Sequence, residues 1–220
     1  MVKKTILLFI VFLFSLHIAC SEKETEKKAV TAAPATVDNT QTQKQPIPPP
    51  KPNDSTEQPK IKKEKAAVIE TNFGKIVFRF YFNDAPNTCE NFITLTEKGF
   101  YDNLTFHRVV RRFVIQGGCP VGNGTGDPGY NIKAEFNSKK HLKGSVAMAR
   151  SDHRDSAGCQ FYICLAPQPK LDNKYTVFGQ VIEGIDVVDK IGSVETAPNE
   201  MPIKPVIMNK VYIEEREIPE

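Results

Sequence analysis

Short runs of alternating apolar and polar residues dominate the chain after residue 65, and this period of two predicts β-strands. The clearest run covers residues 75–82, where Ile76, Phe78, Phe80 and Phe82 would share one face. A turn at Asn-Phe-Gly joins this run to residues 66–71, so the two form a hairpin. We expect six further strands, with two inside residues 106–118 and one each at residues 144–149, 160–165, 176–181 and 206–213.

Two other segments predict short helices. The first begins near Asp84, with Pro86 at a first-turn position where its missing N–H costs nothing, and it ends at Lys98 and Gly99. The second covers residues 184–192 and has Gly at both ends. Eight short strands with two helices predict a mainly β domain at residues 66–220, built as a barrel or a sandwich.

The first 20 residues have the pattern of an export signal. Lys3 and Lys4 precede the apolar residues 6–14, a run too short to span a bilayer comfortably. Ala19 directly before Cys20 resembles a bacterial lipoprotein signal, in which the cysteine is lipidated, although His17 departs from that pattern. An ordinary cleaved signal and an uncleaved anchor are the alternatives. All three predict a chain exported from the cytoplasm. We expect it in the cell envelope, lipid-anchored in the periplasm or on an outer surface.

Residues 21–65 predict a disordered tether. They contain no aromatic residue, begin with a Lys/Glu run and include the Pro-rich stretch PIPPPKP at residues 46–52. Such a composition buries too little apolar surface to offset the entropy lost on ordering. We therefore interpret the segment as a spacer with a stiff Pro-rich part.

The charge distribution argues against nucleic-acid binding. The whole chain has 29 basic and 26 acidic residues, of which 18 and 19 lie at residues 66–220. The predicted domain is thus almost neutral and lacks the basic surface of a nucleic-acid-binding protein.

Several sequence blocks in that domain resemble the cyclophilins. They are FHRV at residues 106–109, FVIQGG at 113–118, GNGTG at 122–126, GSVAMAR at 144–150, SAGCQFYI at 156–163 and LDNKYTVFG at 171–179. The resemblance covers about residues 66–216. It implies a closed eight-stranded antiparallel β-barrel capped by two α-helices, and peptidyl-prolyl cis-trans isomerase activity without a cofactor or a metal.

The resemblance also implies the roles of individual residues. The catalytic residues would be Arg108, Gln116 and Phe113, with the Arg108 guanidinium directed at the prolyl nitrogen. The substrate would contact seven further residues, which are Val114, Ala149, Arg150, Gln160, Tyr162, Leu171 and Tyr175. Three positions depart from the family pattern. Tyr162 stands where the family usually has Phe, and Tyr175 stands where many members have His. Lys170 stands where cyclosporin-sensitive members have Trp, so we expect weak cyclosporin binding.

Other chemically suggestive residues have simpler explanations. His107 is expected to pack in the core or against the hairpin, Ser151-Asp152-His153 to form a solvated turn instead of a catalytic triad, and Arg111-Arg112 to face solvent. Cys89, Cys119, Cys159 and Cys164 lack the spacing of zinc ligands. We expect them to be free core thiols, with a Cys119–Cys159 disulfide as the alternative and with Cys159 and Cys164 facing opposite sides.

Two functions remain open at this point. The first is an envelope-tethered prolyl isomerase that acts on proline-containing peptides and unfolded exported proteins. The alternative is a non-catalytic module that binds Pro-containing segments as a chaperone or in adhesion. A barrel that binds a small ligand is disfavoured, because the many Phe side chains would fill its interior. We expect a monomer.

Overall fold

The computed structural model describes residues 61–219. The expected leader with Cys20, and residues 21–60 of the expected tether, lie outside the described residues. Within the described part, no helix has both the length and the apolar character needed to cross a membrane.

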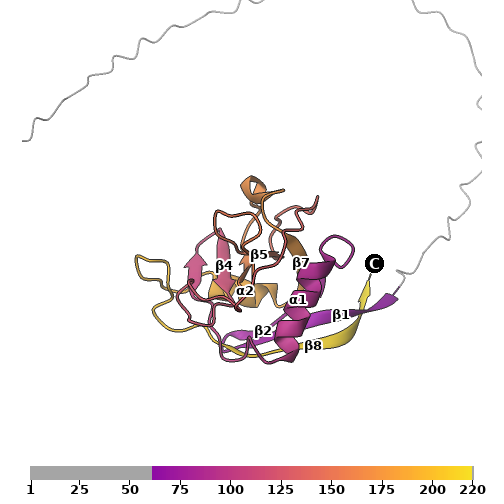
Figure 1. Ribbon diagram of the computed structural model, residues 1–220. Coiled ribbons are helices and arrows are strands. Elements are labelled where there is room, and N and C mark those ends of the chain that lie inside the picture. Colours follow the sequence, from indigo (N-terminus) through magenta and orange to yellow (C-terminus); the bar gives the residue numbers. More distant parts are fainter. Residues whose placement is uncertain (1–60, 220) are drawn as a thin grey trace, which may run out of the picture. The chain divides into compact units, whose positions relative to one another are not determined.

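The described residues form eight strands, two α-helices and one short 3-10 helix (Figure 1). The strands are β1 (Ile61–Thr71), β2 (Gly74–Phe80), β3 (Arg108–Val110), β4 (Val114–Gly117), β5 (Ser145–Met148), β6 (Phe161–Cys164), β7 (Val177–Glu183) and β8 (Met208–Pro219). The helices are α1 (Pro86–Glu97), η1 (Pro169–Leu171) and α2 (Ile185–Ile191). The mainly β prediction with eight strands and two α-helices is confirmed, whereas η1 was not predicted.

The strands make one antiparallel sheet in the order β3-β4-β6-β5-β7-β2-β1-β8. The predicted closed barrel is not supported, because β3 and β8 end the sheet and form no ladder with each other. The segments before them meet only through an isolated bridge between Thr105 and Ile207 and a few backbone hydrogen bonds. Asn103, with a φ of 64°, interrupts the extended backbone just before this contact. The sheet therefore curves toward closure without completing it.

The first strand begins earlier than expected. Strand β1 starts at Ile61, inside the segment expected to be tether, and pairs with β8 from Ile61 opposite Pro219 onward. Lys63, Glu64 and Lys65 lie opposite Glu217, Arg216 and Glu215, so each facing pair carries opposite charges. Such cross-strand pairs stabilise a sheet. Figure 1 shows the paired ends of β1 and β8 extending beyond the rest of the sheet.

Aromatic side chains between the sheet and α1 form the centre of the core. Phe92 of α1 is fully buried, and its ring centroid lies 4.7 Å from that of Tyr101 and 5.3 to 5.6 Å from those of Phe78, Phe161 and Phe178. The alternation predicted for residues 75–82 is confirmed in part: Ile76, Phe78 and Phe80 are buried in the main core, but Val77 on the other face is buried too and β2 ends before Phe82. These rings fill the interior, as expected for a sheet that curves around its own core.

Helix α1 is capped by a residue far from it in sequence. One carboxylate oxygen of Glu135 accepts hydrogen bonds from the backbone and side-chain N–H groups of Asn87, at 3.1 and 2.7 Å. The other accepts from the backbone N–H and hydroxyl of Thr88, at 2.8 and 2.7 Å. Burial favours a raised pKa for Glu135, but these hydrogen bonds outweigh it and lower the pKa. The first turn of α1 thus has an ionised cap that its own sequence does not supply.

Helix α2 follows Gly184, a position that disfavours any residue with a side chain. Gly184 has a φ of 83°, and a Cβ there would lie 2.1 Å from the carbonyl oxygen of Lys75. The helix then buries Val187, Val188 and Ile191.

All four cysteines of the described residues are free and buried. The prediction of free core thiols is therefore confirmed, and the alternative Cys119–Cys159 disulfide is not formed. Cys159 packs in the main core, whereas Cys164 belongs to a separate cluster with Val114 and Tyr162. The two thiols thus lie on different sides, as expected.

Candidate active site

The β3–β4 hairpin brings Arg108 and Gln116 side by side. Arg108 is the direct cross-strand partner of Gln116, which in turn lies opposite Tyr162 of β6. Residues that face each other across antiparallel strands lie on the same side of the sheet. The three side chains therefore form a row across β3, β4 and β6, and the hairpin turn places Phe113 beside it.

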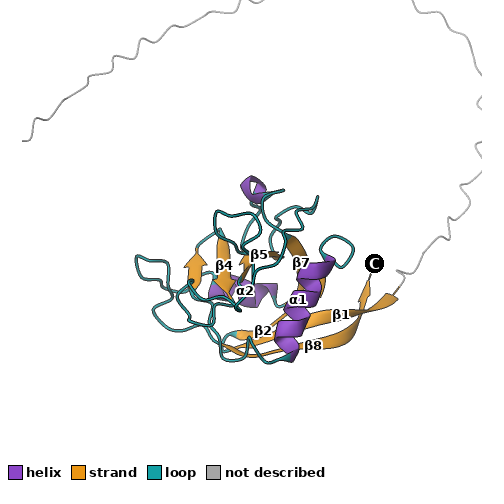
Figure 2. Cartoon of the chain, viewed as in Figure 1, coloured by secondary structure: helices purple, strands orange, loops and turns teal. Residues whose placement is uncertain are grey.

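Nine of the ten predicted catalytic and substrate-contacting residues line one cavity of about 260 Å³. They are Arg108, Phe113, Val114, Gln116, Ala149, Arg150, Tyr162, Leu171 and Tyr175. Gln160 lines a neighbouring cavity of about 400 Å³, which shares Gln116, Ala149 and Arg150 with the first. Long loops surround β4 and β5 in Figure 2, and five of the nine lining residues lie outside the strands.

The cavity is apolar on one side and polar on the other. Phe113, Val114, Tyr162, Leu171 and Tyr175 belong to one hydrophobic cluster that forms its wall. Across from them, Arg108 Nη1 donates to Gln116 Oε1 at 3.4 Å, and Gln116 Nε2 donates to Gln160 Oε1 at 3.1 Å. Gln160 Nε2 in turn donates to the carbonyl oxygens of Gly124 and Gly126 at 2.8 and 2.9 Å. A chain of hydrogen bonds therefore orders the polar edge.

Arg108 has a second side-chain partner, which sequence reasoning did not identify. Its Nε donates to Glu200 Oε2 at 2.6 Å. The centre of its guanidinium lies 5.8 Å from the centroid of the Phe113 ring. Its remaining N–H groups have no hydrogen-bond partner within residues 61–219.

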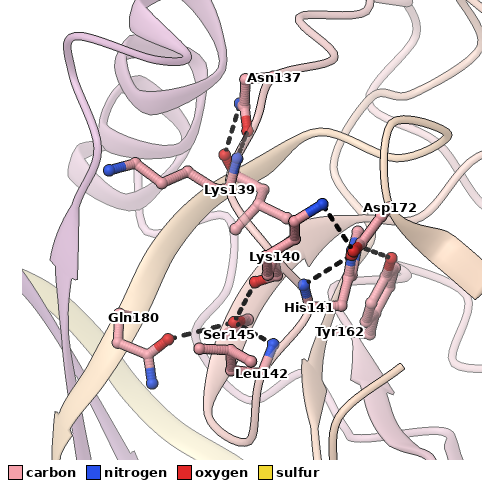
Figure 3. Close-up of polar contacts among 10 residues, drawn as sticks. Asn137, Lys139, Lys140, His141, Leu142, Ser145, Tyr162, Asp172 and Gln180 are labelled. Atoms are coloured by element: carbon pink, nitrogen blue, oxygen red, sulfur yellow. Dashed lines mark hydrogen bonds and ion pairs between the residues drawn. The ribbon is translucent and has the colours of Figure 1, made fainter. Parts of the chain in front are cut away.

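Tyr162 is held from behind by a buried histidine (Figure 3). His141 Nδ1 lies 3.0 Å from Asp172 Oδ1, and His141 Nε2 lies 3.0 Å from the Tyr162 hydroxyl. Because a carboxylate only accepts hydrogen bonds, Nδ1 carries the imidazole proton and Nε2 accepts from the Tyr162 hydroxyl. The His141 side chain is fully buried and does not line the cavity. The Tyr162 hydroxyl is thus hydrogen-bonded to His141, which does not line the cavity, whereas Tyr162 itself does.

The protonation states agree with this assignment. Burial lowers the pKa of His141, and the hydrogen bond and charge of Asp172 offset the shift only in part. Burial likewise raises the pKa of Tyr162. The backbone N–H of His141 lowers the pKa of Asp172. At neutral pH the three hydrogen-bonded side chains are therefore a carboxylate on Asp172, a neutral imidazole on His141 and a neutral phenol on Tyr162.

The other two departures from the family pattern lie in different surroundings. The Arg150 guanidinium stacks 4.7 Å from the centroid of the Tyr175 ring while its Nε donates to the carbonyl oxygen of Lys174 at 3.0 Å. Tyr175 is therefore held against the cavity by Arg150. Lys170 is exposed on η1 and does not line the cavity.

The residues interpreted as structural lie where expected. His107 is only 6% exposed, and burial followed by the neighbouring charge of Arg108 lowers its pKa. Residues 151–153 are exposed, and the Ser151 hydroxyl bonds to Ser156. Arg111 is exposed and donates to the carbonyl oxygen of Ser193 at 3.0 Å. Within the described part of the chain, no group of three or more His, Cys, Asp or Glu side chains could hold a metal ion.

Comparison with known proteins matches this domain to one family. Residues 66–213 match the model of the cyclophilin type peptidyl-prolyl cis-trans isomerases. A peptidyl-prolyl cis-trans isomerase of Helicobacter pylori is 46% identical over 139 residues, which is 61% of this chain and 85% of the relative. One from Synechococcus elongatus is 54% identical over 114 residues, which is 52% and 78% of the two chains.

A solved structure shares the fold. It is a cyclophilin type peptidyl-prolyl cis-trans isomerase of Cryptosporidium parvum, crystallised in the presence of the dipeptide Ala-Pro. Its TM-score is 0.66 at 29% identity, and the match covers 68% of this chain and 98% of that one.

Proposed function

Because the chain belongs to the cyclophilin-type peptidyl-prolyl cis-trans isomerase family, we propose that the cavity beside Arg108 holds the proline of an Xaa-Pro segment and that Arg108 promotes rotation of its peptide bond. The observation that carries this proposal is the guanidinium at the polar edge of a cavity with an apolar wall, with N–H groups that have no partner within residues 61–219. The apolar wall suits the methylene groups of a proline ring, which have no hydrogen-bonding atom to satisfy.

The chemistry follows from the nature of the barrier. Rotation about a peptide bond costs about 18–20 kcal/mol, because twisting removes the resonance between nitrogen and carbonyl. In the twisted state the prolyl nitrogen regains its lone pair and accepts hydrogen bonds better than in either planar state. A donor directed at that nitrogen binds the transition state more tightly than the ground states and so lowers the barrier. Arginine offers several N–H donors in a fixed planar arrangement, so Arg108 suits this role.

The other cavity residues have supporting roles in this proposal. Gln116 is fixed by its hydrogen bonds to Arg108 and Gln160 and binds the substrate backbone near the rotating bond. Phe113 and Leu171 hold the proline ring against Tyr162. The larger cavity next to Gln160 receives the residues that precede or follow the proline. No step needs a nucleophile, a metal or a cofactor.

An Arg108→Ala variant tests the proposal. We expect its catalytic efficiency on an Ala-Pro peptide, measured by exchange NMR, to fall about 100-fold, as for removal of one transition-state donor. Arg111→Ala is the matched control, because it removes the same charge from the same hairpin at an exposed position. If the wild-type protein binds the peptide but exchanges it no faster than buffer does, the domain is a non-catalytic binding module and the proposal fails.

The cellular setting completes the proposal. We infer that the chain is exported and assists the folding of exported or envelope proteins, with unfolded, proline-containing segments as substrates and with the domain acting as a monomer. Support comes from the charged and apolar leader, from Ala19-Cys20 and from the Pro-rich residues 46–52. In the lipidated form, Cys20 would attach the chain to a membrane.

A further inference from the structure

A carboxylate holds the guanidinium that the proposed mechanism uses. Glu200 Oε2 and Arg108 Nε are 2.6 Å apart, and both side chains are partly exposed, at 44% and 35%. A pair of this exposure contributes little to fold stability. Its geometry, however, fixes the Nε side of a planar group that lines the cavity.

A small loop carries Glu200 to this position. Residues 195–203, called the Glu200 loop below, double back so that Thr196 bridges Pro202 and the Ala197 N–H donates to the Met201 carbonyl at 2.8 Å. At the tip, the Glu200 carbonyl accepts the backbone N–H of Val109 at 2.8 Å. Glu200 thus contacts β3 twice, once through its backbone and once through its side chain.

The backbone of Glu200 is in a conformation that glycine would adopt more easily. Its φ is 65°, which lies in the left-handed region. A residue with a Cβ pays free energy to adopt this region, and glycine does not. Glycine would also keep both backbone hydrogen bonds of the tip. The only hydrogen-bond partner of the Glu200 side chain within residues 61–219 is Arg108, so a role for this glutamate is to be sought at that guanidinium.

We propose that Glu200 is a positioning residue that orients the Arg108 guanidinium for transition-state binding. Glu200 binds Nε, and Gln116 binds Nη1, at 2.6 and 3.4 Å. These two hydrogen bonds restrict rotation of the guanidinium, so its remaining N–H groups stay available to a substrate in the cavity that Arg108 lines. This inference rests on the proposed isomerase function and adds a residue from outside the recognised sequence blocks.

A Glu200→Gly substitution separates positioning from stability. It removes the carboxylate and the backbone strain together, so we expect an unchanged melting temperature. We also expect a kcat about tenfold lower, as for loss of a charge-assisted hydrogen bond, with KM for an Ala-Pro peptide almost unchanged. Glu200→Gln keeps a neutral oxygen acceptor and should recover part of the lost kcat. Glu195→Gln removes an exposed carboxylate from the same loop and should match the wild type.

An NMR readout of the Arg108 side chain makes the test independent of activity. In the wild type, the bound Arg108 Nε–H should give a downfield, slowly exchanging signal that is absent in Glu200→Gly. A wild-type kcat in Glu200→Gly, or an unaltered Nε–H signal, overturns the inference. So does a loss of activity that only accompanies a loss of folded protein. An inactive wild type that still shows the bound Nε–H signal refutes the isomerase proposal and leaves only the contact between Glu200 and Arg108 established.

Discussion

At the scale of single residues, Tyr162 shows how a substitution in a binding wall can leave the cavity surface aromatic. Its hydroxyl would cost free energy if it lay unpaired in the apolar cluster. His141, anchored by Asp172, accepts that hydroxyl at 3.0 Å. The phenylalanine expected from the family pattern would leave Nε2 of the buried His141 without this partner. Each of the two buried groups therefore depends on the other for its hydrogen bond.

Tyr162→Phe should consequently destabilise the fold despite being a small change. We expect the free energy of unfolding, measured by urea denaturation at pH 7.5, to fall by about 1–3 kcal/mol, the cost of an unsatisfied buried polar group. Tyr175→Phe is the matched control, because the Tyr175 hydroxyl has no hydrogen-bond partner within residues 61–219. Equal stability losses in the two variants would show that the His141 hydrogen bond contributes nothing.

At the scale of elements, helix α1 depends on a loop that follows it by more than 35 residues in sequence. The helix begins with Ala85 and Pro86, neither of which has a side-chain acceptor for the first N–H groups. Glu135 supplies four hydrogen bonds there instead. Its negative charge also suits the positive end of the helix dipole.

Glu135→Gln should therefore lower the free energy of unfolding by about 1 kcal/mol at pH 7, as for loss of a helix cap. The folded pKa of Glu135 is lowered, so the contribution is fully present above the ordinary value of 4.5 and is lost as the pH falls through the folded value. The variant and the wild type should converge in stability under acid. Glu90→Gln, an exposed charge removal on the same helix, is the control. A stability difference that persists unchanged at pH 3 would contradict the assigned role.

The elements themselves were largely predictable, and the exceptions have a common cause. Alternation and glycine positions indicated β2, α1 and α2, because those signals are local. The start of β1 was missed because Lys63, Glu64 and Lys65 have the composition of a linker, and only their pairing with β8 makes them a strand. Likewise, closure of the sheet depends on how two distant edges meet, and no local pattern records that.

At the scale of the whole molecule, the candidate site also has residues that the sequence predicts and residues that only the fold reveals. The sequence blocks identified the ten proposed site residues, and the structure places them around two adjoining cavities. Glu200 and His141 escaped notice because each acts on a residue more than 20 positions away. Neither position follows a periodic pattern or a recognised block. Second partners of this kind become visible only when the chain is folded.

The proposed lipid anchor is also a property of the whole chain. We expect Cys20→Ser to move the full-length protein from the membrane fraction to the soluble fraction of its native host, because the acyl attachment site is lost. The isomerase activity per molecule should not change. Ala33→Ser, in the segment expected to be tether, is the control. Membrane retention of the Cys20 variant would instead favour an uncleaved anchor, and a soluble wild type an ordinary cleaved signal.

The early start of β1 determines how mechanical load would enter the domain. A pull that reaches Ile61 along the axis of β1 would load the two ladders of this strand, which is hydrogen-bonded to β8 on one side and to β2 on the other. Those bonds resist together, in shear, instead of opening one after another. Arg108 and Gln116 lie on β3 and β4, at the opposite end of the strand order. Tension on an anchored molecule would thus be borne first by β1 and by its hydrogen bonds to β8 and β2.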